Sequence, residues 1–261
     1  MFSFARRFLA HRDSRRVMVR CSFDAAMNVL FVHGFGGARG ALERSLADVA
    51  RGGSHHFLPV RWPSGDLREM RARAVVEVAR RVAEKKSLPK GLVDAAMYGH
   101  QQASQAWQQA VANVPAGAAE LGLAIEQAHA TGKSIAVVAF SLGCRVLLYA
   151  IAAGVIRPGG VHRLVLAGSA APASSFTCLS AVTAATKILH VYSRRDAVLD
   201  RLYPFGDRSE KPTGREPLRI DGIENIEVDV GHRGYASIAP RLWELATVPS
   251  LDVLPSQTKA L

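Results

Sequence analysis

The sequence predicts an α/β protein whose central sheet is mostly parallel and is covered by helices on both faces. Short apolar runs of strand length alternate along the chain with segments in which apolar residues recur at helical spacing. The clearest run is 135–140 (IAVVAF), which is continuously apolar, as expected of a strand buried on both faces. It leads directly into Ser141-Leu142-Gly143 and then into an apolar helical pattern. We therefore expect the fold to be organised around this strand, turn and helix.

The remaining elements follow from the same two periodicities. Alternating or continuous apolar patterns predict further strands at 16–23 (an edge strand), 28–32, 56–61, 162–167, 187–192 and 225–230. Helical spacing predicts helices at 41–50, 118–130 and 234–247, besides the helix that follows Ser141. Because strands and helices alternate, the strands should be parallel, with their carboxyl ends at one edge of the sheet.

The 261 residues are enough for one large domain, which we place at 21–248. Within it, about 66–114 reads as a helical insertion without a strand. The insertion could be a lid over the site or a helical pair packed on the sheet edge. Residues 1–20 form a basic arm, interpreted either as an amphipathic helix on a membrane surface or as a flexible arm or cover for the sheet edge. Residues 249–261 read as a loose tail.

Charge and hydropathy limit the classes of partner. No run of about 18 apolar residues is present, so we expect no membrane span. The formal net charge of +11 favours anionic surfaces, including phospholipid head groups. The basic residues are dispersed, not interleaved with aromatic residues, and no nucleic-acid-binding module is recognisable, so we expect no nucleic-acid partner. The oligomeric state is not predicted.

The cysteines and a phosphate-loop-like tripeptide exclude other chemistry. The three cysteines, Cys21, Cys144 and Cys178, lack a disulfide framework, which favours a reducing, cytoplasmic location, with peripheral membrane contact left open. None has metal-ligand spacing with a histidine, and we expect neither a metal nor a cofactor. Residues 132–134 (GKS) lack the glycine five places earlier and precede a strand, so they are not a phosphate-binding loop.

The turn at Ser141 is typical of a nucleophile elbow, in which a serine stands between a buried strand and a helix. The turn is sharp, so the residues two places before and after the serine must be small. Gly143 meets this need, and Ala139 stands where glycine is more usual. Cys144, in the first turn of the following helix, is a weaker rival nucleophile.

Two further residues complete a candidate catalytic triad. Asp196 follows the strand at 187–192, and His232 follows the strand at 225–230. Ligands of open parallel sheets bind outside the carboxyl ends of the strands, so both should meet Ser141 there. An imidazole activates the serine, and a carboxylate fixes the imidazole tautomer. Asp200 and Asp207 are alternative acids further from the strand end.

Two loops are candidates for the substrate pocket. After the strand at 28–32, His33-Gly34-Phe35-Gly36-Gly37 offers backbone N–H groups to a ligand at low steric cost. In the long loop after Asp196, Tyr203 and Phe205 could wall the pocket or anchor the loop to the sheet.

These motifs (VHGFGG, AFSLGCR, YSRRDAVL and DVGHRGY) resemble those of the α/β-hydrolase superfamily over residues 28–245. The resemblance implies that the backbone N–H groups of Leu142 and Phe35 form an oxyanion hole. FSLGCRV, GIENIEVDVGHRGY and the helical insertion look most like uncharacterised hydrolase-like proteins related to the transmembrane and coiled-coil domain-containing family.

The predicted function is that of a serine hydrolase that cleaves carboxylic esters, including lipid esters, through an acyl-enzyme. The order Ser141, Asp196, His232 is the order of serine, acid and histidine in α/β-hydrolases. The alternative is a non-catalytic protein of the same fold that binds an anionic membrane surface or a partner. Amide and thioester cleavage remain open, because a fold does not determine a function.

Overall fold

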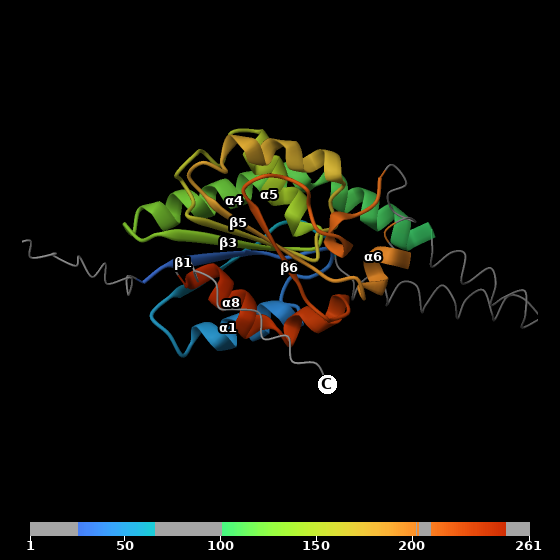
Figure 1. Ribbon diagram of the computed structural model, residues 1–261, viewed down its shortest axis with the longest axis horizontal. Coiled ribbons are helices and arrows are strands. Elements are labelled where there is room, and N and C mark those ends of the chain that lie inside the picture. Colours follow the sequence, from blue (N-terminus) through green and yellow to red (C-terminus); the bar gives the residue numbers. More distant parts are fainter. Residues whose placement is uncertain (1–25, 66–100, 202, 204–209, 249–261) are drawn as a thin grey trace, which may run out of the picture.

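The computed structural model describes residues 26–65, 101–201, 203 and 210–248. Their centre is a six-stranded sheet with the order β2-β1-β3-β4-β5-β6 (Figure 1). All neighbouring strands pair in parallel. The strands are β1 (Asn28–Val32), β2 (His56–Val60), β3 (Ile135–Phe140), β4 (Arg163–Ala167), β5 (Lys187–Tyr192) and β6 (Ile223–Glu227). The predicted fold class, an α/β-hydrolase-like parallel sheet, is thereby confirmed.

Helices cover the sheet on both faces (Figure 1). One face packs against α4 (Val114–His129), α5 (Gly143–Ala152) and the 3₁₀ helix η1 (Ala173–Ala181), and the other against α1 (Ala41–Ala50) and α8 (Ala239–Thr247). Shorter elements lie in the loops beyond the strands: α6 (Ala197–Arg201), η2 (Thr213–Arg215) and η3 (His232–Ala236).

The alternation of β3 side chains between the two faces explains its continuous apolar sequence. Val137 belongs to the core cluster under α4 and α5, whereas Val138 belongs to the cluster under α1 and α8. Both side chains are fully buried, as are most others of β3. β3 pairs with β1 on one side and with β4 on the other, so neither its faces nor its edges meet solvent. The turn that follows β3 therefore begins from a rigidly packed strand.

The predicted bounds hold for β1, α1, β3 and β5, and β2 and β4 are each one residue shorter than predicted. β6 differs more, because it spans Ile223–Glu227 and not 225–230. Its only described neighbour, β5, ends at Tyr192 and gives residues beyond 228 nothing to pair with. The helix predicted at 118–130 begins at Val114, with a proline in its first turn, a position that suits proline.

The predicted final helix, 234–247, is divided into η3 and α8. Pro240 lies in the first turn of α8, where its missing N–H costs no hydrogen bond, so the α-helix begins only there. The predicted edge strand at 16–23, the arm 1–20, the tail 249–261 and most of the insertion lie outside the described residues. The described end of the insertion, 101–112, is helical.

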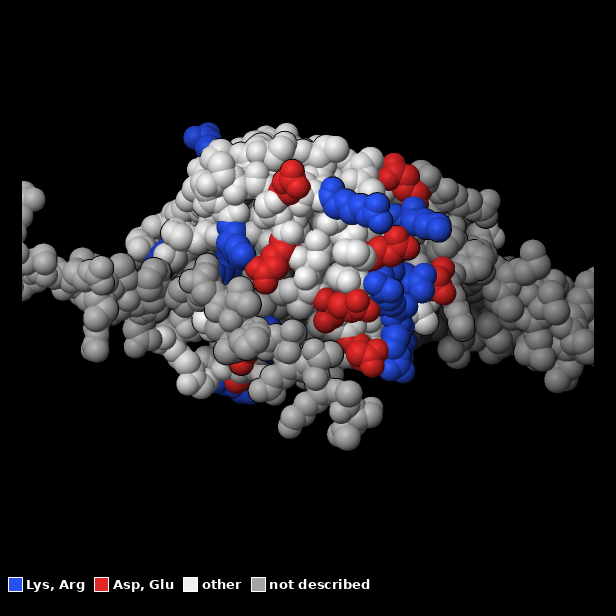
Figure 2. Space-filling model, in the orientation of Figure 1, with Lys and Arg blue, Asp and Glu red and all other residues white. Residues whose placement is uncertain are grey.

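Several charged side chains on the described surface form ion pairs with one another. Ion pairs join Lys187 to Glu224 (2.6 Å) and Arg195 to Asp229 (3.0 Å) beside the β6 edge, and Figure 2 shows acidic and basic groups next to one another on this face. More than half of the net positive charge is carried outside the described residues. Among the described helices, none is long and apolar enough to cross a membrane.

Candidate active site

Ser141 stands at a strained turn between β3 and α5. Its φ is +54°, a conformation that costs a non-glycine residue roughly 1–3 kcal/mol. Its backbone is held on both sides, since its N–H donates to Ala167 O (3.0 Å) and its carbonyl accepts from Ala170 N (3.1 Å). The end of β4 therefore fixes the turn, and the serine side chain lies at the carboxyl edge of the sheet.

Close approach of the loop after β1 explains two glycines at this turn. A Cβ on Gly143 would lie 2.3 Å from the carbonyl oxygen of Val32, and a Cβ on Gly34 would lie 2.7 Å from Cβ of Ser141. Neither position accepts a larger residue without displacing backbone or the serine. Ala139, the unusual residue of the elbow sequence, is accommodated in the core with no exposed area.

His232 and Asp196 are joined by a hydrogen bond of 2.6 Å between Nδ1 and Oδ2. The other carboxylate oxygen of Asp196 accepts the N–H groups of Val198 (3.1 Å) and Leu199 (3.0 Å) at the start of α6. The carboxylate thus caps a helix and orients an imidazole at the same time. It is completely buried, whereas 14% of the His232 side chain is exposed.

The imidazole is also held by aromatic contacts. The ring of Phe140, the last residue of β3, lies 4.8 Å from the ring of His232, and Tyr235 packs against both. The loop that carries His232 is tied to the end of β5, because Ser193 donates its hydroxyl to Val230 O (2.6 Å). His232 and Ser141 face the same pocket, and no hydrogen bond joins them in this structure. Such bonds are often long before substrate binds.

The rival residues are placed elsewhere. Asp200 forms an exposed ion pair with Arg215 and does not bond His232, and Asp207 lies outside the described residues. Cys144 is fully buried, and burial raises the pKa of its thiol to about 12, so it is not a thiolate near neutral pH. Among the residues that the structure describes, no group of three or more His, Cys, Asp or Glu side chains could hold a metal ion.

Phe35 lies in the loop after β1, and Leu142 directly follows Ser141 in the elbow. Within the described part of the chain, neither amide donates to a backbone carbonyl, although neighbouring amides of both turns do. Their predicted role as donors to a developing oxyanion stays a prediction.

A pocket of about 700 Å³ opens onto these groups. It is mostly apolar and is lined by the loop after β1, the first turn of α1, the helix at 101–112, α6 and the His232 loop. The predicted pocket residues His33, Gly34 and Tyr203 line it, and Phe205 lies outside the described residues.

Three aromatic rings form a continuous wall of this pocket. Trp107 contacts Phe35 (5.6 Å between ring centres) and Tyr203 (5.9 Å), edge to face in both cases. Tyr203 accepts a hydrogen bond of 2.5 Å from the guanidinium of Arg145 on α5, which also donates to Ala170 O (2.7 Å). Tyr203 therefore lines the pocket and ties its loop to α5, whereas the sequence interpretation placed the anchor on the sheet.

Sequence reasoning missed two pocket residues. Trp107 lies in the insertion, far from the elbow in sequence, and no local pattern marks it as a pocket residue. Glu43 lies in the first turn of α1, where Arg61 contacts it twice (2.5 and 2.8 Å) and the Arg39 N–H once (2.9 Å). Burial alone would raise the pKa of Glu43, but these donors lower it, so the carboxylate is ionised and engaged.

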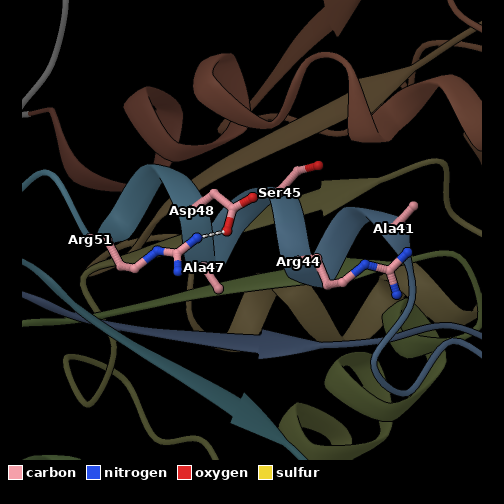
Figure 3. A pocket seen from close by; sticks show the side chains of 6 residues that line it. All are labelled: Ala41, Arg44, Ser45, Ala47, Asp48 and Arg51. Atoms are coloured by element: carbon pink, nitrogen blue, oxygen red, sulfur yellow. Dashed lines mark hydrogen bonds and ion pairs between the residues drawn. The ribbon is translucent and has the colours of Figure 1, made fainter.

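A second hollow, of about 400 Å³, lies on the outer side of α1 (Figure 3). Its lining comes from that one helix, and the only polar interaction drawn there is the ion pair between Arg51 and Asp48. No residue of the elbow or of the His232 loop reaches it. We assign no function to this hollow.

Comparison with known proteins gives only distant structural matches. No protein-family model matches the chain, and no curated protein matches it. A crystal structure from Xanthomonas campestris pv. campestris, provisionally described as a hydrolase of the alpha/beta superfamily, is 17% identical, covers 83% of this chain and 95% of its own, and has a TM-score of 0.41. An uncharacterised Bacillus cereus protein is 13% identical, covers 93% of this chain and 63% of its own, and has a TM-score of 0.42. No family model and no curated protein supports the resemblance to the transmembrane and coiled-coil domain-containing family.

Proposed function

We propose that this protein is a serine hydrolase that cleaves carboxylic esters through an acyl-enzyme. The observation that carries the proposal is the 2.6 Å hydrogen bond that His232 Nδ1 donates to the buried carboxylate of Asp196, with His232 in a pocket shared with Ser141. Individually these residues have ordinary roles as a helix cap, a loop histidine and a turn serine. Their combination at a strained turn is the arrangement that nucleophilic catalysis requires.

In the first half of the proposed reaction, Ser141 Oγ attacks the ester carbonyl carbon as His232 Nε2 takes its proton. The electron pair of the carbonyl bond moves to oxygen, which accepts hydrogen bonds from the Phe35 and Leu142 N–H groups. Asp196 stabilises the imidazolium. When the tetrahedral intermediate collapses, His232 gives the proton to the leaving alkoxide, and the acyl group remains on Ser141.

In the second half, water attacks the acyl-enzyme with His232 as base. The tetrahedral oxyanion forms again and collapses, the bond to Ser141 Oγ breaks, His232 returns its proton to that oxygen, and a carboxylic acid leaves. No cofactor enters this scheme. The water is supplied from the pocket mouth, where His232 and Arg233 are partly or fully exposed.

The pocket lining supports an apolar acyl group as the bound half of the substrate. The aromatic wall of Phe35, Trp107 and Tyr203, together with Leu199, offers apolar area but few polar groups to hold a charged chain. The resemblance of FSLGCRV and the DVGHRGY segment to hydrolase-like members of the transmembrane and coiled-coil family adds lipid esters to the substrates worth testing.

The test combines covalent labelling with turnover. A fluorophosphonate probe should label Ser141, and p-nitrophenyl esters of graded acyl length should be hydrolysed. Ser141→Ala should remove the labelling and lower kcat at least about 10³-fold, because the nucleophile is lost. Cys144→Ser, which changes the buried rival, serves as the control and should retain activity. Labelling at another residue, or undiminished turnover by folded Ser141→Ala, would exclude the proposal.

Peripheral contact with an anionic membrane is a second proposal, supported by the net charge of +11. Membrane contact requires no catalysis, so this proposal is also the alternative in which the protein binds a membrane and is not a hydrolase. The full chain should sediment with vesicles containing phosphatidylserine at low salt and be released as salt is raised, because electrostatic attraction is screened. Equal sedimentation with neutral vesicles, or none at low salt, would contradict it.

A further inference from the structure

The peptide that joins Gly34 to Phe35 is held at its carbonyl end by a buried histidine. His33 Nδ1 lies 3.0 Å from Gly34 O, and the N–H of Gly37 donates to the same oxygen at 3.0 Å. A carbonyl oxygen only accepts, so Nδ1 must carry the proton in this contact. The Gly34 C=O and the Phe35 N–H belong to one planar peptide and point in opposite directions. Fixing the oxygen therefore fixes the direction of the N–H.

His33 is itself held by the segment that follows β2, residues 62–65, which we call the β2 exit loop. Trp62 donates its indole N–H to His33 O (3.0 Å), and the two rings are stacked with centres 5.6 Å apart and planes at 19°. Ser64 Oγ lies 3.3 Å from His33 Nδ1, and Ser64 O accepts the Gly36 N–H (3.0 Å). The β2 exit loop thus makes three polar contacts with residues 33–36 of the loop after β1.

This arrangement around His33 has an energetic cost that side-chain packing alone does not explain. His33 is 1% exposed, and its Nε2 is buried without a partner among the described residues. An apolar side chain would fill the same space without an unpaired polar atom. Burial lowers the pKa of His33, although its bond to Gly34 O acts in the other direction, so the imidazole stays neutral and keeps a single proton.

We propose that His33 is a positioning residue for ester hydrolysis: aligned by the β2 exit loop, its Nδ1–H fixes the Gly34–Phe35 peptide so that the Phe35 N–H points at the oxyanion. The inference rests on the proposed serine hydrolase function. The positioning role predicts an effect on the transition state and not on substrate binding. The carbonyl oxygen of the substrate needs the Phe35 N–H most when that oxygen becomes charged.

The distinguishing experiment uses two amides that place a donor at different ring positions. In His33→Asn the side-chain N–H₂ replaces Nδ1, and in His33→Gln it replaces Nε2. We expect His33→Gln to lower kcat about 10- to 100-fold with KM changed less than about three-fold, a fraction of the loss seen when an oxyanion donor is removed. His33→Asn should restore kcat to within about three-fold of the wild type.

Inhibitor binding gives a readout that a merely structural role would not affect. A trifluoromethyl ketone forms a tetrahedral adduct with an oxyanion, whereas the product acid does not. His33→Gln should weaken the ketone in proportion to its loss of kcat and leave product affinity unchanged. Trp62→Phe keeps the ring stack but removes the bond to His33 O, and should lower kcat about three- to ten-fold, also without a change in KM.

Each outcome decides a different question. Equal losses in His33→Asn and His33→Gln, a rise in KM at constant kcat, or unchanged kcat in His33→Gln and Trp62→Phe would overturn the positioning role. Absence of turnover in the wild type, or activity in Ser141→Ala, would overturn the proposed function, and the positioning role with it. If a His33 variant does not fold, as judged by its thermal transition, Trp62→Phe decides alone.

Discussion

Two histidines of this protein are held in the same way but lie in different surroundings, one inside the sheet and the other at an open pocket. His232 and His190 each present Nδ1 to a side-chain oxygen, at 2.6 Å from Asp196 and 3.1 Å from Asn225. His190 lies within β5 and is completely buried, with Nε2 unpartnered among the described residues, whereas Nε2 of His232 belongs to a ring that lines an open pocket. The geometry of a paired imidazole does not by itself define a catalytic group.

The partner and the surroundings make the difference. Asn225 is neutral and is fixed by two bonds to Leu218, so its oxygen must face His190. A neutral amide in the sheet interior does not compensate a charged imidazolium, and burial lowers the pKa of His190 to about 4. Asp196 supplies a negative charge, and the end of the sheet supplies access. A catalytic base needs both the charged partner and the access. The contribution of the partner can be tested by replacing Asp196 with an amide.

The largest effect should come from Asp196→Asn, which gives His232 the partner type of His190. The two N–H groups of α6 require an oxygen at Oδ1, so the amide nitrogen must face His232 Nδ1. Two donors cannot share that position, and the imidazole is driven into the tautomer whose Nε2 carries a proton and accepts none from Ser141. We expect kcat to fall roughly 10³- to 10⁴-fold, as measured with p-nitrophenyl esters.

The matched control is Asp200→Asn, four residues further on in the same α6 segment. Asp200 pairs with Arg215 at the surface and has no contact with the imidazole, so its loss should change kcat less than about two-fold. Comparable losses in the two variants would show that the segment is merely sensitive to substitution. Full activity in Asp196→Asn would exclude this residue as the acid of the triad.

The strands next to these two histidines are predicted with unequal accuracy, for physical reasons. β1, β3 and β5 were placed to the residue, because strands buried on both faces are continuously apolar. β6 is an edge strand with mostly half-buried or exposed side chains, and its bounds depend on where β5 stops offering partners. His232 therefore lies in a loop five residues beyond β6, and not directly after a strand as predicted.

Order along the chain sufficed to select Asp196, but it could not show how that residue is held. In the structure separate oxygens of its carboxylate serve two contacts, since Oδ1 accepts from α6 and Oδ2 accepts from His232. Trp107 and the β2 exit loop could not be assigned to the site, because such contacts are set by tertiary packing and leave no local pattern. Likewise, nothing in the apolar run of β5 distinguished His190 from a surface histidine.

A smaller effect, on the free energy of unfolding, should show that His190 is uncharged in the folded protein. In the unfolded chain its pKa takes the ordinary value of 6.5, and in the folded chain it is about 4. Between these values the unfolded state binds a proton that the folded state does not, so stability falls as pH decreases from 6.5 to about 4 and levels off below. The contribution is at most roughly 3 kcal/mol of unfolding free energy.

Urea unfolding of the wild type and His190→Asn between pH 7 and 4 isolates this contribution. The new amide can still donate to Asn225 but does not titrate, so the stability of the variant should decline less steeply with acid. The exposed His162→Asn should follow the wild-type pH dependence. Parallel curves for the wild type and His190→Asn would mean that His190 takes up its proton in the folded protein as readily as in the unfolded chain. Burial would then not set the protonation of His190, and the differences left between the two histidines would be the charged partner and the pocket access of His232.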